Sequence, residues 1–103
     1  MVTTSQAETK SDAELAALAK ALGHPARVQL VRMLAARDSC YVGELADELP
    51  LAQSTISEHL RILREAGVVT SGTLAGRPCY CLSGDKLAAL ANGISGLQGP
   101  DCC

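Results

Sequence analysis

The sequence contains no phenylalanine and no tryptophan, and Tyr41 and Tyr80 are its only tyrosines. A core for this chain must therefore be built from leucine, valine, isoleucine and alanine. The lack of aromatics also counts against the binding of single-stranded nucleic acid, whose bases stack on aromatic side chains. With 103 residues, the chain forms one domain that buries a modest share of its surface, so a homodimer would be a natural source of further burial.

Other absences narrow the class of protein. No apolar run approaches the length of a membrane span, and the N-terminal MVTTSQAETK lacks the basic and apolar regions of a signal peptide. We therefore expect a cytoplasmic protein with no membrane partner. Only two histidines are present, and no nucleophile–base arrangement is visible. We expect neither an enzyme nor an organic cofactor.

The chain also lacks an excess of positive charge, since its formal net charge is −2. A site for nucleic acid must therefore come from a local basic surface. Residues 51–82 carry three arginines against two glutamates, while acidic residues concentrate elsewhere. The segregation of charge is present but weak.

The first part of the chain predicts two helices after a polar tail. Residues 1–10 have no periodicity and are expected to be a flexible N-terminal tail. Ser11 and Glu14 have the spacing of a capping box, which predicts a helix that runs to about Leu22. Pro25 then suits the first position of a second helix, which ends near Arg37.

The stretch LAQSTISEHLRILREAG, residues 51–67, has the strongest pattern. Ile56, Leu60 and Leu63 form one apolar stripe at helical spacing, and the opposite face is polar. Gln53 or Ser54 is expected to cap the helix, and Gly67 is placed to end it. A shorter helical pattern, residues 42–49, precedes it across a break of about four residues, which is typical of a helix-turn-helix. An ordinary amphipathic helix hairpin gives the same spacing.

Two β-prone runs follow, residues 68–74 and 77–82, joined by Ala75-Gly76, and they predict a β-hairpin. A last helix opens at Ser83-Gly84-Asp85 and ends near Gly93 to Gly96. The predicted fold class is mainly α with a small β-hairpin wing, a winged helix-turn-helix over residues 11–96. Residues 97–103 are expected to be a flexible C-terminal tail that contains cysteines.

Three stretches, ALGHPARVQLVRML, VGELADELPLAQSTISEHLRILREAGVV and GRPCYCLS, resemble the ArsR/SmtB family of bacterial winged-helix metalloregulators. They extend from about Leu18 to Leu82, and the pattern SxISxHLxxLxxAGxV is specific to that family. The resemblance implies a homodimer paired through the first and last helices. It also implies that the dimer binds double-stranded operator DNA and represses an operon until an inducer binds.

The resemblance also implies which residues face DNA, with hydroxyl and amide groups near base edges and guanidinium groups near phosphates. His59 has the alternative role of a half-buried helix residue, and His24 is expected to be a structural cap before Pro25. The predicted DNA-facing positions are Gln53, Ser54, Thr55, Ser57, His59, Arg61 and Arg64, with Arg77 in the wing.

The inducer is inferred from the five cysteines. The last helix has no histidine, so a zinc site of oxygen and nitrogen ligands is unsupported. The Cys-x-Cys pair of one arsenite-sensing subgroup is absent, because Cys40 stands alone. An arsenite-type subgroup that resembles this chain carries thiols at the Cys40 and Cys81 positions and a C-terminal pair, and As(III) and Sb(III) take three thiolates. The candidate ligands are Cys102, Cys103, Cys40, Cys81 and Cys79.

Each thiol also has a purely structural interpretation. Cys79 and Cys81 alternate with Tyr80 and Leu82 along the predicted strand. If Tyr80 and Leu82 face the core, both thiols face outward. If the register is reversed, both thiols are core residues. Cys40 suits packing as well as it suits ligation. Adjacent Cys102 and Cys103 have no packing role on a flexible tail and are the stronger functional indication.

Two other functions remain open at this point. The same repressor could sense persulfide or oxidant by bridging two thiols. A small thiol carrier that delivers metal and does not bind DNA belongs to a different class.

Overall fold

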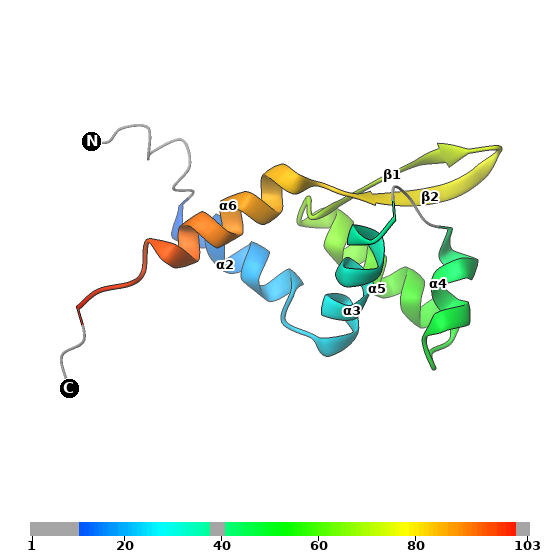
Figure 1. The fold of residues 1–103 in the computed structure, drawn as a ribbon, viewed down its shortest axis with the longest axis horizontal. Coiled ribbons are helices and arrows are strands. Elements are labelled where there is room, and N and C mark those ends of the chain that lie inside the picture. The colour runs from blue at the N-terminus through cyan, green and yellow to red at the C-terminus, as the bar shows by residue number, and fades with distance from the viewer. Residues whose placement is uncertain (1–10, 38–40, 101–103) are drawn as a thin grey trace.

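The computed structural model describes residues 11–37 and 41–100 (Figure 1). The predicted N-terminal tail, the residues 38–40 that include Cys40, and the terminal Cys102 and Cys103 lie outside the described residues. The elements, in chain order, are α2 (Asp12–Ala21), α3 (Pro25–Ala35), α4 (Val42–Glu48), α5 (Gln53–Glu65), β1 (Val69–Leu74), β2 (Arg77–Leu82) and α6 (Gly84–Ser95). Within the described residues, the predicted order of helices and hairpin is confirmed.

Local sequence chemistry explains where the helices begin and end. At α2, the Ser11 hydroxyl accepts a hydrogen bond from the Glu14 amide at 3.1 Å, and the Glu14 carboxylate accepts one from the Ser11 amide at 3.2 Å. The predicted capping box is therefore confirmed. After α5, Gly67 has a φ of +85°, the left-handed conformation that ends a helix.

The predicted cap of α5 is wrong. Ala52 is the N-cap residue, in an extended conformation, and it offers no side-chain hydrogen bond. Gln53 is already the first helical residue. The side chains of Gln53 and Ser54 are therefore not used as the N-cap of α5, and both are exposed to solvent.

The core is aliphatic, as the composition requires. The α5 stripe of Ile56, Leu60 and Leu63 is fully buried, and it packs with Leu30 of α3 and Leu45 of α4. Each such side chain contributes about 1.5–3 kcal/mol of transfer free energy when it is removed from water. This burial fixes which face of α5 is left to solvent.

The hairpin is antiparallel, with a register that runs from Val69 opposite Leu82 to Leu74 opposite Arg77. Ala75 and Gly76 form the tip with φ values of +54° and +77°. Two positive φ angles suit a tight hairpin turn, and Ala75 adopts this conformation at a steric cost that glycine avoids. β2 packs against α3 and α4, and β1 contacts α5.

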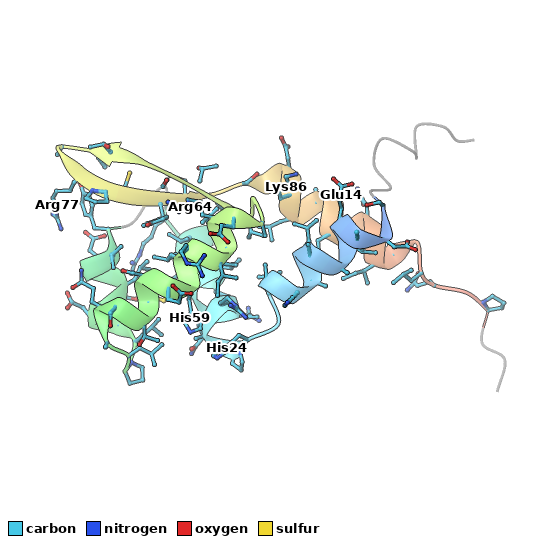
Figure 2. All side chains as sticks on the ribbon, turned by 180° about the vertical axis from the view of Figure 1, so that it is seen from behind. Glu14, His24, His59, Arg64, Arg77 and Lys86 are labelled. Atoms are coloured by element: carbon cyan, nitrogen blue, oxygen red, sulfur yellow. The ribbon has the colours of Figure 1, made fainter. Side chains whose placement is uncertain are left out.

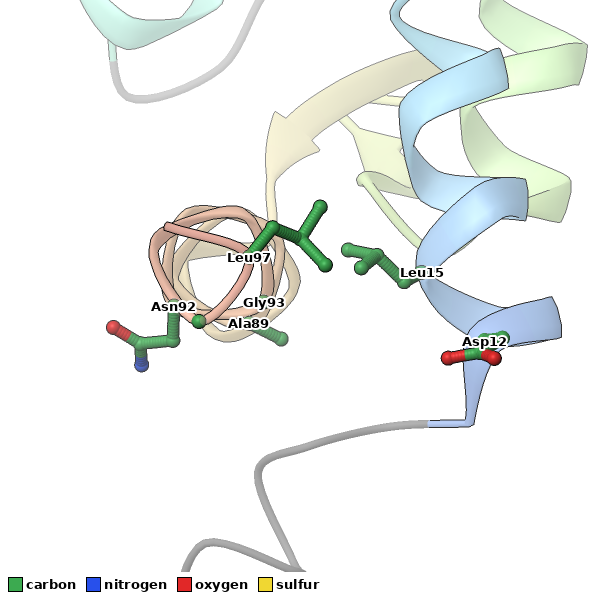
Figure 3. A pocket seen from close by; sticks show the side chains of 7 residues that line it. Asp12, Leu15, Ala89, Asn92, Gly93 and Leu97 are labelled. Carbon is green, nitrogen blue, oxygen red and sulfur yellow. The ribbon is translucent and has the colours of Figure 1, made fainter. Parts of the chain in front are cut away.

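Helices α2 and α6 lie side by side at one end of the molecule, away from the tip of the hairpin (Figure 1). Their close approach depends on Gly93, because a Cβ atom there would lie 2.7 Å from Leu15 Cδ1. Figure 3 shows Leu15 of α2 directed toward Leu97 across this contact. None of the helices in the described part of the chain is long and apolar enough to cross a membrane.

Candidate nucleic-acid interface

The exposed face of α5 carries the polar residues that the sequence pattern predicts for it. Gln53, Ser54, Thr55 and Ser57 are all exposed in the first turns of the helix, directly after the break that follows α4. Side-chain amides and hydroxyls at the start of the second helix of a helix-turn-helix are placed to reach base edges in a major groove. The core stripe forces this orientation, since it lies on the opposite side of α5.

A shallow groove joins this face to the wing. One wall comes from α5 and the N-terminal turn of α4, and the other comes from β2. The groove is lined by Tyr41, Val42, Gly43, Gln53, Ser57, Arg77, Pro78 and Tyr80. The start of α5 and the tip of the hairpin therefore border one continuous surface.

Arg61 is less available to DNA than its position suggests. Its guanidinium binds Glu58 through Nε at 3.0 Å and Nη2 at 2.5 Å, and it binds Glu65 through Nη1 at 2.5 Å. The hydrogen bond from Arg61 lowers the pKa of the Glu58 carboxyl, and the hydrogen bonds to Glu58 and Glu65 raise the pKa of Arg61. Two carboxylates thus offset the charge of one arginine on the exposed face.

Arg64 differs from Arg61 in this respect. It is exposed one turn further along α5, and none of the ion pairs found in residues 11–37 and 41–100 involves it. Figure 2 shows Arg64 toward the end of the same helix that carries His59. Arg64 is therefore the arginine of α5 that is better placed to contact a phosphate.

His59 does not lie on the exposed polar face. It is half-buried, and its ring centroid lies 4.5 Å from that of His24, at the start of α3 (Figure 2). Its Nδ1 atom is buried without a hydrogen-bond partner in the described chain. Burial lowers the pKa of His59, and the nearby His24 and Arg27 lower it further. The alternative of a half-buried helix residue describes this placement, while a contact between His59 and DNA stays a prediction.

His24 has the structural role expected of it. Its Nδ1 atom accepts a hydrogen bond from the Ala26 amide at 3.0 Å, which caps the N-terminus of α3 just before Pro25. The hydrogen bond uses the lone pair of Nδ1 as its acceptor.

Sequence reasoning missed the contact between the wing and the start of α4. The guanidinium carbon of Arg77 lies 3.8 Å from the centroid of the Tyr41 ring. The Tyr41 hydroxyl also donates a hydrogen bond to the carbonyl oxygen of Leu74 at 3.2 Å. These partners are more than thirty positions apart in the sequence, so no local pattern indicated the contact.

The cysteines of the described chain do not form a cluster. Cys79 is buried, with 8% of its surface exposed, and Cys81 is half-buried. Tyr80 and Leu82 pack against the core, which is the alternative in which both thiols face outward, but that alternative is wrong for Cys79 because it is buried. Cys79 is buried and its neighbour Tyr80 is half-buried, and adjacent strand residues point to opposite faces, so both faces of β2 are partly covered. Within the described residues, no group of three potential metal ligands occurs.

The exposed reading face on α5, the helix-turn-helix that presents it and the hairpin beside it define a winged-helix DNA-binding protein. Comparison with known proteins agrees. Residues 24–71 match the family model described as "Bacterial regulatory protein, arsR family". The chain is also 41% identical over 85 residues to the biofilm growth-associated repressor of Agrobacterium fabrum, a match that covers 82% of this chain and 72% of that protein. The chain belongs to the ArsR/SmtB family of DNA-binding transcriptional regulators.

Solved structures show the same fold. A possible transcriptional regulator for arsenical resistance has a TM-score of 0.71 and 33% identity, covering 77% of this chain and 81% of that one. A homodimeric winged helix-turn-helix domain from Mycobacterium bovis has a TM-score of 0.67 and 25% identity, covering 84% of this chain and 88% of that one.

Proposed function

We propose that this protein is a homodimeric repressor that binds operator DNA through α5 and the wing and dissociates when As(III) or Sb(III) binds its cysteine thiolates. The observation that carries the DNA-binding part is the continuous exposed surface that runs from Gln53 and Ser57 to Arg77. Such a surface offers polar groups to base edges and a guanidinium group to a phosphate in one docking arrangement.

The proposal of a dimer rests on the end of the molecule that carries α2 and α6. There Ile94 is 51% exposed and Leu97 is 73% exposed, an unusual amount of apolar surface for two neighbouring positions. The homodimeric relative from Mycobacterium bovis supports pairing in this fold. A two-fold axis through this end would place one copy of α5 in each half of a palindromic operator.

The proposed inducer follows from the chemistry of thiolates, which suit soft, thiophilic ions. Cys102 and Cys103 would supply two sulfurs, and the third would come from Cys40 or Cys81. Cys81 is the more accessible thiol of β2, whereas the burial of Cys79 makes it the weakest of the five candidates. The related structure described as a possible regulator for arsenical resistance supports this choice of inducer.

A second candidate function keeps the repressor and changes the signal. A disulfide or persulfide bridge needs only two thiols, so Cys102 and Cys103 would suffice without a third ligand. Membership of a family of DNA-binding regulators counts against the third candidate, a thiol carrier that does not bind DNA.

The test is the fluorescence anisotropy of the reduced protein on its own upstream promoter DNA, titrated with arsenite. We expect binding, followed by release at about one metalloid per protomer. The C102S/C103S double variant should bind the DNA equally well and should no longer respond to arsenite, while the buried control C79S should respond like the wild type.

The other outcomes separate the alternatives. Arsenite-dependent release that persists in the C102S/C103S variant would move the site to Cys40, Cys79 and Cys81. Release by a persulfide donor, with no effect of arsenite, would support the two-thiol repressor. No binding to the promoter would contradict the repressor and favour the carrier.

A further inference from the structure

Tyr41 connects the start of α4 with the wing, two parts of the interface that are far apart in the sequence. Its backbone starts α4, where its carbonyl oxygen accepts hydrogen bonds from the Glu44 amide at 3.0 Å and the Leu45 amide at 3.2 Å. The Tyr41 amide in turn donates to the Glu44 carboxylate at 3.4 Å. Because Leu45 is fully buried in the core, its hydrogen bond holds the backbone of Tyr41 in place at the start of α4.

The tip of the wing, by contrast, has little support of its own. An isolated two-stranded hairpin is only marginally stable in water, and residues 70–78 of this one are exposed. Tyr41 contacts both ends of the tip turn, since its hydroxyl binds the Leu74 carbonyl and its ring stacks on Arg77. Leu74 and Arg77 are the last paired residues of the ladder.

The contact with the Tyr41 ring leaves the N–H groups of the Arg77 guanidinium able to bind a phosphate. A ring that packs against the face of a guanidinium leaves the N–H groups in its plane, where they can donate to a phosphate. Arg61 is the opposite case, because its N–H groups are taken by Glu58 and Glu65. The contact with Tyr41 therefore orients the charge of Arg77 without neutralising it.

We propose that Tyr41 is a positioning residue for DNA binding, which holds the wing tip and aims the Arg77 guanidinium at the DNA backbone. This rests on the proposed binding of operator DNA by α5 and the wing. Tyr41 does not itself contact DNA in this arrangement, and it acts through Arg77 and the Leu74 carbonyl.

The experiment measures the affinity of the full-length reduced protein for its promoter DNA over a range of salt concentrations. We expect Y41L and R77A each to weaken binding by about fivefold. Each should also reduce the slope of log K against log salt by about one, the contribution of one phosphate contact. Y41F, which keeps the ring and loses the hydroxyl, should keep the slope of the wild type.

The double variant Y41L/R77A decides whether Tyr41 acts through Arg77. If it does, the double variant binds no more weakly than R77A alone. R32A is the matched control for R77A, since Arg32 is an exposed arginine of α3 and lies outside the proposed surface of α5 and the wing, and it should bind the DNA like the wild type. Circular dichroism should show that all variants stay folded.

Several results would overturn the proposal. A Y41L variant with the affinity and salt slope of the wild type would contradict it, as would losses from Y41L and R77A that add in full. Failure of the wild-type protein to bind the promoter would instead contradict the proposed function, so the two failures are distinguishable.

Discussion

At the scale of single residues, the contact between His24 and His59 is the least expected feature. The two rings meet where the N-terminus of α3 packs against α5, and Arg27 adds a third basic group nearby. Glu58, on the neighbouring position of α5, opposes their effect on His59. Burial and two of its basic neighbours therefore disfavour the charged form of His59, where α3 meets α5.

This arrangement predicts a dependence of stability on pH. Burial lowers the pKa of His59 below its ordinary value of 6.5, so the unfolded chain binds a proton there more readily than the folded chain does. The free energy of unfolding should be fully retained above about pH 6.5 and should fall as the pH drops from there toward the lowered pKa. Urea unfolding between pH 8 and pH 5 measures this effect.

The matched variants are H59Q and H24N. H59Q should flatten the change in stability in this pH window, because the titrating group is gone. H24N keeps an N-cap side chain for α3 and should retain part of the change. A wild-type protein whose unfolding free energy is constant from pH 7 to pH 5.5 would contradict the explanation.

At the scale of elements, α5 combines a buried apolar stripe with an exposed face on which two carboxylates offset the positive charge of Arg61. The pairs of Arg61 with Glu58 and Glu65 have the i, i+3 and i, i+4 spacing at which helical side chains meet. Exposed pairs of this kind add little to the stability of a helix, because water screens them. Their main effect here is on the charge that α5 presents to DNA.

Removal of one carboxylate should therefore strengthen DNA binding. E58Q is expected to increase the affinity for promoter DNA severalfold and to steepen its salt dependence, because Arg61 then keeps more of its charge for phosphate. E14Q, a similar change on α2, is the control and should leave affinity nearly unchanged, because Arg61 pairs with Glu58 and Glu65 and not with Glu14. A salt slope for E58Q equal to that of the wild type would show that Arg61 does not approach the DNA.

Local chemistry made most of these elements predictable. The capping box at Ser11, the left-handed Gly67 and the stripe on α5 each depend on residues no more than seven positions apart, so a local sequence pattern predicts them. The exposure of Gln53 and Ser57 follows from the same stripe. The pairing of Arg61 with Glu58 and Glu65 is also a local feature, with i, i+3 and i, i+4 spacing.

What could not be predicted depends on packing between distant segments. The contact of Tyr41 with Leu74 and Arg77 exists only because the hairpin folds back over the start of α4. The burial of Cys79 is likewise set by the folded chain around β2 and not by the local sequence. A period of two along the strand indicates which residues share a face, and it does not show how much of each face is covered.

At the scale of the whole molecule, the layer of α2 and α6 is the expected dimer interface. Ile94 is 51% exposed on α6, and Gly93 brings α6 close to Leu15 of α2. The variant I94E should fold as a monomer, because a carboxylate buried between two copies would lack a partner. Light scattering measures the mass, and we expect a loss of affinity for a palindromic operator of at least tenfold.

V28E is the control for this experiment. Val28 is also an exposed apolar residue, at 37%, but it lies on α3 and outside the proposed interface. V28E should remain a dimer. A dimeric I94E variant would move the interface to another face.

The binding of Arg61 by Glu58 and Glu65 affects how a DNA-binding protein finds its operator among the other sites of a chromosome. A genome offers on the order of a million or more non-specific sites for each operator, and binding to them depends almost entirely on phosphate contacts. We therefore expect a protein with a formal net charge of −2, whose Arg61 on α5 binds two carboxylates, to be weakly held by such sites. If the protein is the repressor proposed above, a small number of copies per cell would then keep one operator occupied, because few of them would be sequestered elsewhere.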